Sequence, residues 1–269
     1  MSVEKRLLKG PKEIPFGYSS IAEIDGKHAN MLMDFGILRL KAGEEFEEKK
    51  DLECVYLLIK GEADFSWNDN HQNAFRENCF DNSSWVLHVP PQTSIKIKSL
   101  SDKTEISIHR TGNDKKFEAR MYQPKDLPVE IRGAGTMNET GTRRVRTILD
   151  KSLAPWSNFV LGEVINTPGK WSSYPPHIHP QPEIYYYKTL PDNGYGFCEY
   201  GEDVYKVHNN DTVFILPNYT HPQVAAPGYA LWYMWVIRQF EHDPYQPQKY
   251  PHFLEEHNWL REPGAEIWN

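Results

Sequence analysis

The chain has 269 residues, of which 39% are hydrophobic, 25% are charged and 13% are aromatic, and its formal net charge is −7. This composition is typical of a globular protein with a substantial core, and it excludes a disordered chain. The acidic excess argues against a nucleic-acid-binding protein, because recognition of phosphates requires a basic surface.

Three further features restrict where the protein works. The longest apolar run, Tyr229–Ile237, has nine residues, whereas a membrane span requires roughly 18 or more. The first ten residues lack the apolar core of a secretory signal. Only three cysteines occur, which is too few for a disulfide framework. We therefore expect a cytoplasmic protein with neither a membrane nor a nucleic acid as its partner.

Short apolar segments alternate with turn residues along the chain. They are rich in β-branched and aromatic residues, and Gly, Pro, Asn or Asp residues bound them, which is typical of antiparallel strands. The clearest are Cys54–Ile59, Ile95–Ile97, Ile106–Ile108, Val213–Leu216 and Tyr229–Ile237. Helical periodicity is weak and is confined to Phe253–Leu260. The sequence predicts an all-β fold, either a sandwich or a barrel.

A polar stretch between Gly112 and Thr142 indicates a domain boundary. It contains two prolines and several glycines, and it shows little alternation of apolar and polar residues. The spacing of apolar and turn residues is loosely similar on its two sides. We predict two β-barrels, formed by residues 1–115 and residues 116–269.

One cluster of residues in the second half indicates metal chemistry. On a strand, side chains two residues apart point to the same face, so His177 and His179 are expected to face one way. Glu183 has the same parity, and His221 follows a later predicted strand. Three imidazoles and one carboxylate suit zinc, manganese or ferrous iron. With eleven histidines in the chain, one His-x-His pair alone is weak evidence, and the combination carries the prediction.

The same residues carry a resemblance to known families. A His-x-His pair, a Glu soon after it and a later His resemble the ligand pattern of the cupin superfamily. The closer resemblance is to the 5-deoxy-glucuronate isomerase family of bacterial inositol catabolism. That family carries Gly-x-Trp-Ser-Ser-Tyr-Pro-Pro-His-x-His, which is present here from Gly169 to His179. Its Glu-x-Tyr-Tyr element matches Glu183–Tyr186, and a later His-Pro element is similar to Leu216–Pro222. The resemblance is specific between residues 130 and 240.

This resemblance implies a double cupin, or bicupin, whose N-terminal barrel has lost its metal site. The C-terminal barrel would hold a divalent cation, Zn²⁺ or Mn²⁺, on His177, His179, Glu183 and His221. The implied activity is that of an aldose–ketose isomerase of carbohydrate metabolism. Its substrate would be a deoxy-uronic acid, converted from 5-deoxy-glucuronate to 2-deoxy-5-keto-gluconate in myo-inositol catabolism.

Such an isomerase also needs a base to move a proton and a cation to bind the substrate carboxylate. The candidates are Tyr185, Tyr187 and Tyr233 as catalytic residues, and Arg143, Ser173 and Tyr174 as substrate-binding residues. The tyrosines have an alternative role as packing residues of the barrel. Arg143 has an alternative role on a solvated edge, and the Ser–Tyr pair has one in shaping a turn.

Three other functions stay open on the sequence. The first is a related uronate isomerase of pectin breakdown. The second is a sugar-binding cupin without catalysis, because Trp235 puts a large ring where the family pattern has a small polar residue. The third is an iron-dependent dioxygenase, which also uses three His and one Glu. Surfaces rich in Trp and Tyr are compatible with a homo-oligomer.

Overall fold

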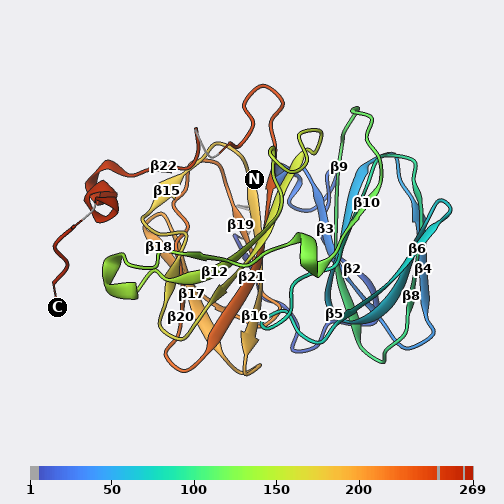
Figure 1. The fold of residues 1–269 in the computed structure, drawn as a ribbon, viewed down its shortest axis with the longest axis horizontal. Helices are drawn as coiled ribbons and strands as arrows, with labels where there is room; N and C mark the ends of the chain where they lie inside the picture. Colours follow the sequence, from blue (N-terminus) through green and yellow to red (C-terminus); the bar gives the residue numbers. More distant parts are fainter. Residues whose placement is uncertain (1–5, 247–248, 263, 269) are drawn as a thin grey trace. The chain divides into compact units, whose positions relative to one another are not determined.

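The computed structural model describes residues 6–246, 249–262 and 264–268. Its elements are almost all strands (Figure 1), and the helices among the described residues are short 3-10 turns. None of the helices in this part of the chain is long and apolar enough to cross a membrane. The all-β expectation is therefore confirmed.

The chain divides into two compact units that are discontinuous in sequence. The N-terminal unit comprises residues 14–128 and 148–159, and the C-terminal unit comprises the described residues up to 13, residues 129–147 and those from 160 onward. This division differs from the two continuous segments expected from the sequence. Residues 6–13 pack with the C-terminal unit, and residues 148–159 pack with the N-terminal one.

The N-terminal unit is a set of antiparallel strands around one apolar core. Its sheet has the order β10-β7-β5-β9-β3-β2, with β4, β6 and β8 joined through β5 and β8. Its strands are β2 (Gly17–Ala22), β3 (Asp34–Leu40), β4 (Glu45–Lys49), β5 (Glu53–Trp67), β6 (Asn70–Arg76), β7 (Val86–Val89), β8 (Ser94–Ser99), β9 (Thr104–Thr111) and β10 (Arg120–Tyr122). Its 3-10 turns are η1 (Ala29–Met31) and η2 (Pro124–Asp126).

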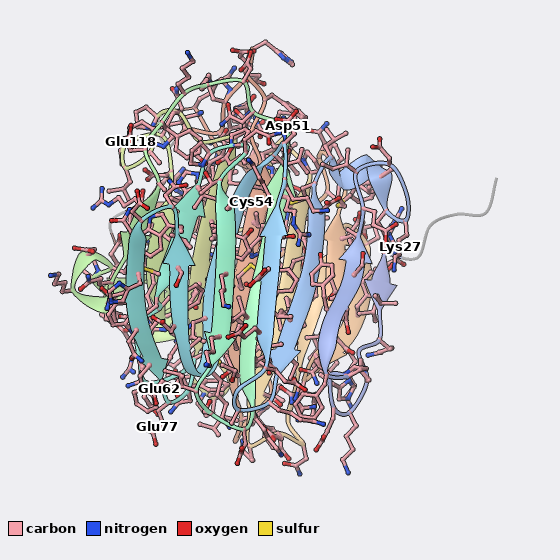
Figure 2. All side chains as sticks on the ribbon, turned by 90° about the vertical axis from the view of Figure 1, so that its right-hand side faces the viewer. Lys27, Asp51, Cys54, Glu62, Glu77 and Glu118 are labelled. Carbon is pink, nitrogen blue, oxygen red and sulfur yellow. The ribbon has the colours of Figure 1, made fainter. Side chains whose placement is uncertain are left out.

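Strand β5 is central to this unit because it pairs with four other strands, β6, β7, β8 and β9. Figure 2 labels Cys54 and Glu62 on it, toward opposite ends. Its first seven residues are buried, whereas Ala63, Phe65 and Trp67 alternate with more exposed neighbours. At Gly61 the backbone has φ +103°, and a Cβ there would lie 2.7 Å from Thr104 Cα. Only glycine tolerates this position easily. The strand changes partners near it, because β5 pairs with β7 up to Leu57 and with β6 from Gly61 onward.

The C-terminal unit has a larger sheet and two smaller ones. The larger sheet has the order β1-β19-β16-β21-β13-β12-β11, and the smaller ones are β14-β20-β17-β18 and β15-β22. The strands of the larger sheet are β1 (Leu7–Leu8), β11 (Glu130–Arg132), β12 (Arg143–Leu149), β13 (Phe159–Asn166), β16 (Glu183–Leu190), β19 (Thr212–Ile215) and β21 (Ala230–Arg238). Those of the smaller sheets are β14 (Trp171–Ser172), β15 (His177–Ile178), β17 (Tyr195–Tyr200), β18 (Asp203–His208), β20 (Gln223–Ala225) and β22 (His252–Phe253). The 3-10 turns are η3 (Met137–Glu139) and η4 (Glu255–Arg261).

The two units repeat one strand order at their centres. The order β7-β5-β9-β3-β2 of the first corresponds to β19-β16-β21-β13-β12 of the second. All five apolar segments expected to be strands lie in strands of the structure, mainly in β5, β8, β9, β19 and β21. The weak helical pattern near residue 253 becomes the 3-10 turn η4.

Inward-facing aromatic residues fill the C-terminal barrel. Tyr185 and Tyr187 on β16 and Tyr233 on β21 are buried in one core cluster with Val145 of β12. Alternation places Glu183 on the same face of β16 as these two tyrosines. The first residue of β16 is therefore a carboxylate at the end of an aromatic-lined interior.

Candidate metal centre

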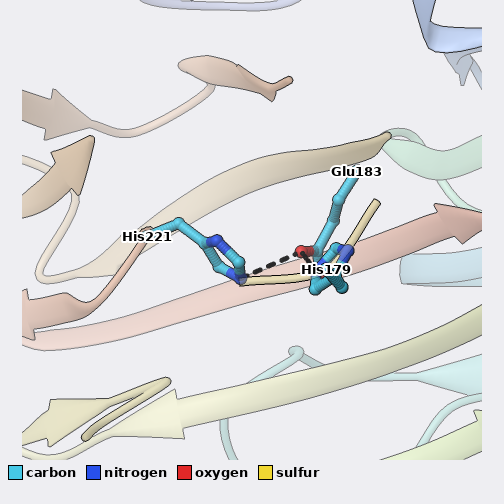
Figure 3. A group of neighbouring side chains, drawn as sticks. All are labelled: His179, Glu183 and His221. Atoms are coloured by element: carbon cyan, nitrogen blue, oxygen red, sulfur yellow. Dashed lines mark hydrogen bonds and ion pairs between the residues drawn. The ribbon is translucent and has the colours of Figure 1, made fainter. Parts of the chain in front are cut away.

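Three buried side chains converge at this end of the C-terminal barrel (Figure 3). His179, Glu183 and His221 each offer a ligand atom, and these atoms lie within 4.8 Å of one another. The Glu183 Oε2 atom lies 3.3 Å from His179 Nε2 and 3.4 Å from His221 Nε2. They come from the residue after β15, from the start of β16 and from the loop after β19. Among the described residues, this is the one group of three or more His, Cys, Asp or Glu side chains with metal-site spacing.

The histidine rings are oriented by backbone carbonyls. His179 Nδ1 lies 2.9 Å from the carbonyl of Gln181, and His221 Nδ1 lies 2.8 Å from that of Tyr219. A carbonyl can only accept, so each Nδ1 carries the proton and each Nε2 keeps a free lone pair. Both Nε2 atoms face Glu183. This is the orientation that metal-ligating histidines usually show.

The charge states also fit a cation. Burial lowers the pKa of His179 and of His221 to about 4, so both rings are neutral near pH 7. Burial raises the pKa of Glu183 to about 7, although His221 and a hydrogen bond with Tyr185 oppose this shift. Neutral imidazoles and a carboxylate that is costly to leave charged are a donor set that a divalent cation would stabilise.

His177 lies beside this group and is not a member of it. Its ring centroid is 4.9 Å from that of His221, and its Nδ1 atom lies 3.1 Å from the carbonyl of Pro175. Burial lowers its pKa well below the ordinary value, and the neighbouring histidines lower it further. The structure thus brings three of the four expected ligands together and puts the fourth next to them, with its Nδ1 atom likewise directed at a backbone carbonyl.

Two of the three expected catalytic tyrosines lie near the group. The Tyr185 ring is 5.8 Å from that of His221 and 4.9 Å from that of Tyr233. The Ser173 hydroxyl lies 3.3 Å from the Tyr185 hydroxyl and 3.4 Å from that of Tyr233. These groups form a hydroxyl network at the barrel end, with Ser173 between the two phenols.

Tyr187 lies further into the barrel. It is two residues beyond Tyr185 along β16, and its hydroxyl donates to Gln223 Oε1 at 2.7 Å. The Gln223 amide in turn donates to the carbonyl of His221 at 2.7 Å. Tyr187 therefore supports the loop that carries His221.

Arg143 faces the same interior. It shares the face of β12 that carries the core residue Val145, and its Nη1 atom donates to the Gly141 carbonyl at 2.9 Å. Burial raises the pKa of Tyr233 to about 12, while hydrogen bonds with serines and the charge of Arg143 oppose that shift. The guanidinium is therefore within electrostatic range of the Tyr233 phenol. Tyr174 packs its ring on Trp171, with centroids 5.6 Å apart.

Trp235 forms part of the inner wall. It pairs with Tyr185 across β21 and β16, and it covers Gly162 of β13 so closely that a Cβ there would lie 2.5 Å from the indole ring. The large ring is thus accommodated by the absence of a side chain on the neighbouring strand. Trp235 thereby packs against the core cluster that contains Tyr185, whose own ring lies 5.8 Å from that of His221.

Two aromatic residues beyond the last barrel strand also contact the histidines. The Tyr245 ring lies 5.2 Å from that of His179, and the Phe253 ring lies 5.5 Å from that of His177. The sequence analysis missed both, because they follow β21 in a segment without regular alternation. Their aromatic character was the single available signal.

Comparison with known proteins agrees with this architecture. A model of the KduI/IolB family matches residues 10–260. The chain belongs to the KduI/IolB family. A protein of Geobacillus kaustophilus named 5-deoxy-glucuronate isomerase is 31% identical over 244 residues, which cover 80% of each chain. A protein of Bacillus subtilis strain 168 with the same name is 24% identical over 86% of this chain and 91% of its own.

Solved structures identify the fold. An IolB-like protein from Salmonella typhimurium LT2 has a TM-score of 0.80 at 23% identity and covers 96% of this chain and 100% of its own. The oxalate decarboxylase of Lactobacillus farciminis has a TM-score of 0.68 at 12% identity and covers 98% and 92% of the two chains. The expected double-cupin fold is confirmed. The family assignment also makes the chain an isomerase.

Proposed function

We propose that this isomerase converts 5-deoxy-glucuronate into 2-deoxy-5-keto-gluconate, with a divalent cation held by the ligand group. The observation that carries the proposal is the buried convergence of His179, Glu183 and His221 with both Nε2 atoms directed at one carboxylate oxygen. The names of the relatives supply the substrate. A place in myo-inositol catabolism and a cytoplasmic location belong to the same proposal.

The fourth ligand in this proposal is His177, whose ring adjoins that of His221. Nitrogen and oxygen donors of this kind suit Zn²⁺ or Mn²⁺. A bound divalent cation would supply Lewis-acid stabilisation of negative charge on the oxygens of an enediolate.

The chain's own groups perform the remaining tasks. An aldose–ketose isomerisation removes a proton from one carbon and returns it to the neighbouring carbon, with no external oxidant or reductant. Tyr185 and Tyr233 lie around Ser173 with their hydroxyls at the barrel end, so they are the groups placed to hold or relay that proton. Arg143, on the same inner face, is suited to bind the substrate carboxylate.

In this proposal the N-terminal barrel has a structural role. The position in β5 that corresponds to Glu183 is Cys54, which pairs with Val89 on one side and Arg110 on the other. Arg110 forms a two-bond ion pair with Glu48, at 3.0 and 2.8 Å, and donates to the Tyr18 hydroxyl at 2.9 Å. An internal guanidinium that is already paired with a carboxylate leaves a poor environment for a metal cation.

The test is to follow carbonyl migration by NMR with metal-loaded protein and 5-deoxy-glucuronate. The 4-deoxy-5-keto-uronate of pectin breakdown serves as the competing substrate. We expect turnover of the first acid and at least tenfold slower turnover of the second. Turnover of the second acid alone would show that the chain is the uronate isomerase of pectin breakdown. Turnover of neither acid would refute the proposed substrate class.

A further inference from the structure

The segment that follows the last barrel strand holds the two histidines of the His-x-His pair. We call residues 239–246 and 249–254 the C-terminal strap. Gln239 is fully buried, and its side-chain oxygen accepts from the backbone N–H of Tyr245 at 2.6 Å. Gln181 is also fully buried, and its side-chain amide donates to the carbonyl of Asp243 at 2.6 Å. The first bond lies within the strap, and the second joins the strap to the segment that carries the His-x-His pair.

Gln181 connects the strap to a metal ligand in two ways. Its backbone carbonyl accepts from His179 Nδ1, and its side chain holds the strap at Asp243. The adjacent Tyr245 ring then lies nearly perpendicular to the His179 ring, with an interplanar angle of 86° and a centroid distance of 5.2 Å. This edge-to-face contact restricts rotation of the imidazole about its Cβ–Cγ bond.

The strap also contacts His177, through strand pairing and through an aromatic ring. In the described residues, β15 forms its two-stranded sheet with β22 of the strap, and His177 pairs directly with Phe253. The Phe253 ring lies 5.5 Å from the imidazole at an angle of 68°. A further hydrogen bond of 3.0 Å joins the Leu254 N–H to the Pro176 carbonyl.

This arrangement matters because His177 lies in a short strand apart from the large sheet, and His179 follows that strand directly. β15 has two residues and is flanked by prolines on both sides, at positions 176 and 180. A strand of that length is not stable by itself. An aromatic ring from the strap contacts each imidazole from outside the ligand group, while the backbone carbonyls of residues 175 and 181 orient the ring nitrogens.

We propose that Tyr245 and Phe253 are positioning residues that hold the imidazoles of His179 and His177 in their metal-binding orientation. This inference rests on the proposed metal site and is independent of the proposed substrate. It assigns the role to the aromatic rings and not to the Tyr245 hydroxyl. Partners that orient metal ligands typically change metal affinity by roughly 10- to 100-fold when they are removed.

The experiment measures zinc affinity of the full chain by competition with a chromogenic chelator. The variants are Tyr245→Leu, Tyr245→Phe and Phe253→Leu, and Trp259→Leu is the control because this exposed ring lies in η4, beyond the strap. We expect at least about tenfold weaker zinc binding in the two Leu variants of the strap. Tyr245→Phe and the control should stay within twofold of the wild-type chain.

A second measurement needs no metal. Hydrogen exchange of the metal-free protein should show faster exchange of the backbone from 176 to 181 in both Leu variants of the strap, with exchange of β16 unchanged. This readout separates a loosened ligand segment from a destabilised barrel.

The outcomes separate this inference from the proposed function. Equal zinc affinity and equal exchange in the wild-type chain and the Leu variants overturn the positioning role. Equal weakening by Tyr245→Phe and Tyr245→Leu also overturns it, because the hydroxyl would then be the active group. A wild-type chain that binds neither zinc nor manganese removes the metal site and this inference with it. Normal zinc affinity without turnover leaves the inference intact and refutes only the substrate.

Discussion

Replacing Glu53 with Gln tests how the N-terminal unit retains its second segment. The Glu53 carboxylate is fully buried and accepts four hydrogen bonds. His88 Nε2 and Ser157 Oγ bind its Oε1 atom at 2.8 and 2.6 Å. The Asn158 N–H and Asn113 Nδ2 bind its Oε2 atom at 2.9 and 2.7 Å. Two of these donors belong to residues 148–159, more than one hundred residues away in sequence.

The expected cost follows from the number of donors that lose an acceptor. Glu53→Gln keeps one of the two side-chain oxygens. It replaces the other oxygen with an NH₂ group, which then faces the two donors that had bound that oxygen. A buried donor without a partner costs about 1–3 kcal/mol, so the change should lower the free energy of unfolding by about 2–6 kcal/mol. Glu62→Gln is the matched control on β5, because Glu62 is partly exposed and accepts a single side-chain bond from Asn73. It should cost less than about 0.5 kcal/mol.

Urea unfolding measures the change in the free energy of unfolding. Hydrogen exchange is then measured separately, and it should localise the lost protection to residues 148–159 and β5. Burial by itself would raise the pKa of Glu53, but the bonds from His88 and its other donors outweigh burial and lower it below 4.5. The contribution of the charged carboxylate is therefore complete above pH 4.5 and declines as the pH falls through the folded-state pKa. A Glu53→Gln chain within about 0.5 kcal/mol of the wild type at pH 7 would refute the reasoning.

Three further predictions concern the site and the pH dependence of stability. His179→Ala should lose bound metal and activity while its circular dichroism spectrum is unchanged. The control, His71→Ala, changes an exposed residue of β6 and should keep both metal and activity. Elemental analysis that finds equal metal in the two variants would show that the ligands are wrongly assigned. Arg143→Ala should raise KM for the sugar acid roughly tenfold or more, with Arg144→Ala on the opposite face of β12 as control, and equal KM values would remove Arg143 from the pocket. Burial, aided by Arg110, lowers the pKa of His109 to about 3. The unfolded chain takes up a proton below pH 6.5 while the folded chain does not, so this residue should cost stability at about 1.4 kcal/mol per pH unit between pH 6.5 and 3, about 2 kcal/mol at pH 5. His109→Gln should remove that part of the slope in urea titrations, and identical slopes would contradict the assignment.

The candidate site shows which parts of a function can be predicted from local pattern. Strand parity put His179 and Glu183 on one side, and the structure brings their ligand atoms within 4.8 Å of His221. Parity also grouped Tyr185 with Tyr187, yet their hydroxyls have different partners. Two residues of additional depth carry Tyr187 to Gln223, which engages its hydroxyl. Alternation specifies a face of a strand, and it carries no information on distance from the barrel end.

The division into units could not be predicted from a composition shift. The polar stretch before residue 142 is visible in the sequence, because turn and charged residues cluster there. The sequence does not show that the early residues belong to the C-terminal unit or that residues 148–159 belong to the N-terminal unit. Lys9 and the N–H of Gly10 bind the Asp211 carboxylate at 2.8 and 2.9 Å, and β1 pairs with β19, so this early segment belongs to the C-terminal unit.

Residue order alone was enough for the β class and for most of the long strands, since alternation and turn residues are properties of short stretches. It also marked His179, Glu183 and His221 as candidate donors, because the donor atom is a property of each side chain. Folding in three dimensions determined which donors satisfy Glu53 and how Tyr245 reaches His179. It also determined which positions of the two barrels correspond, with Cys54 and Arg110 of the first matching Glu183 and Ile237 of the second. Those outcomes depend on hydrogen bonds and ring contacts between residues far apart in the chain. Such contacts are selected by the burial of whole sheets, and no local pattern encodes them.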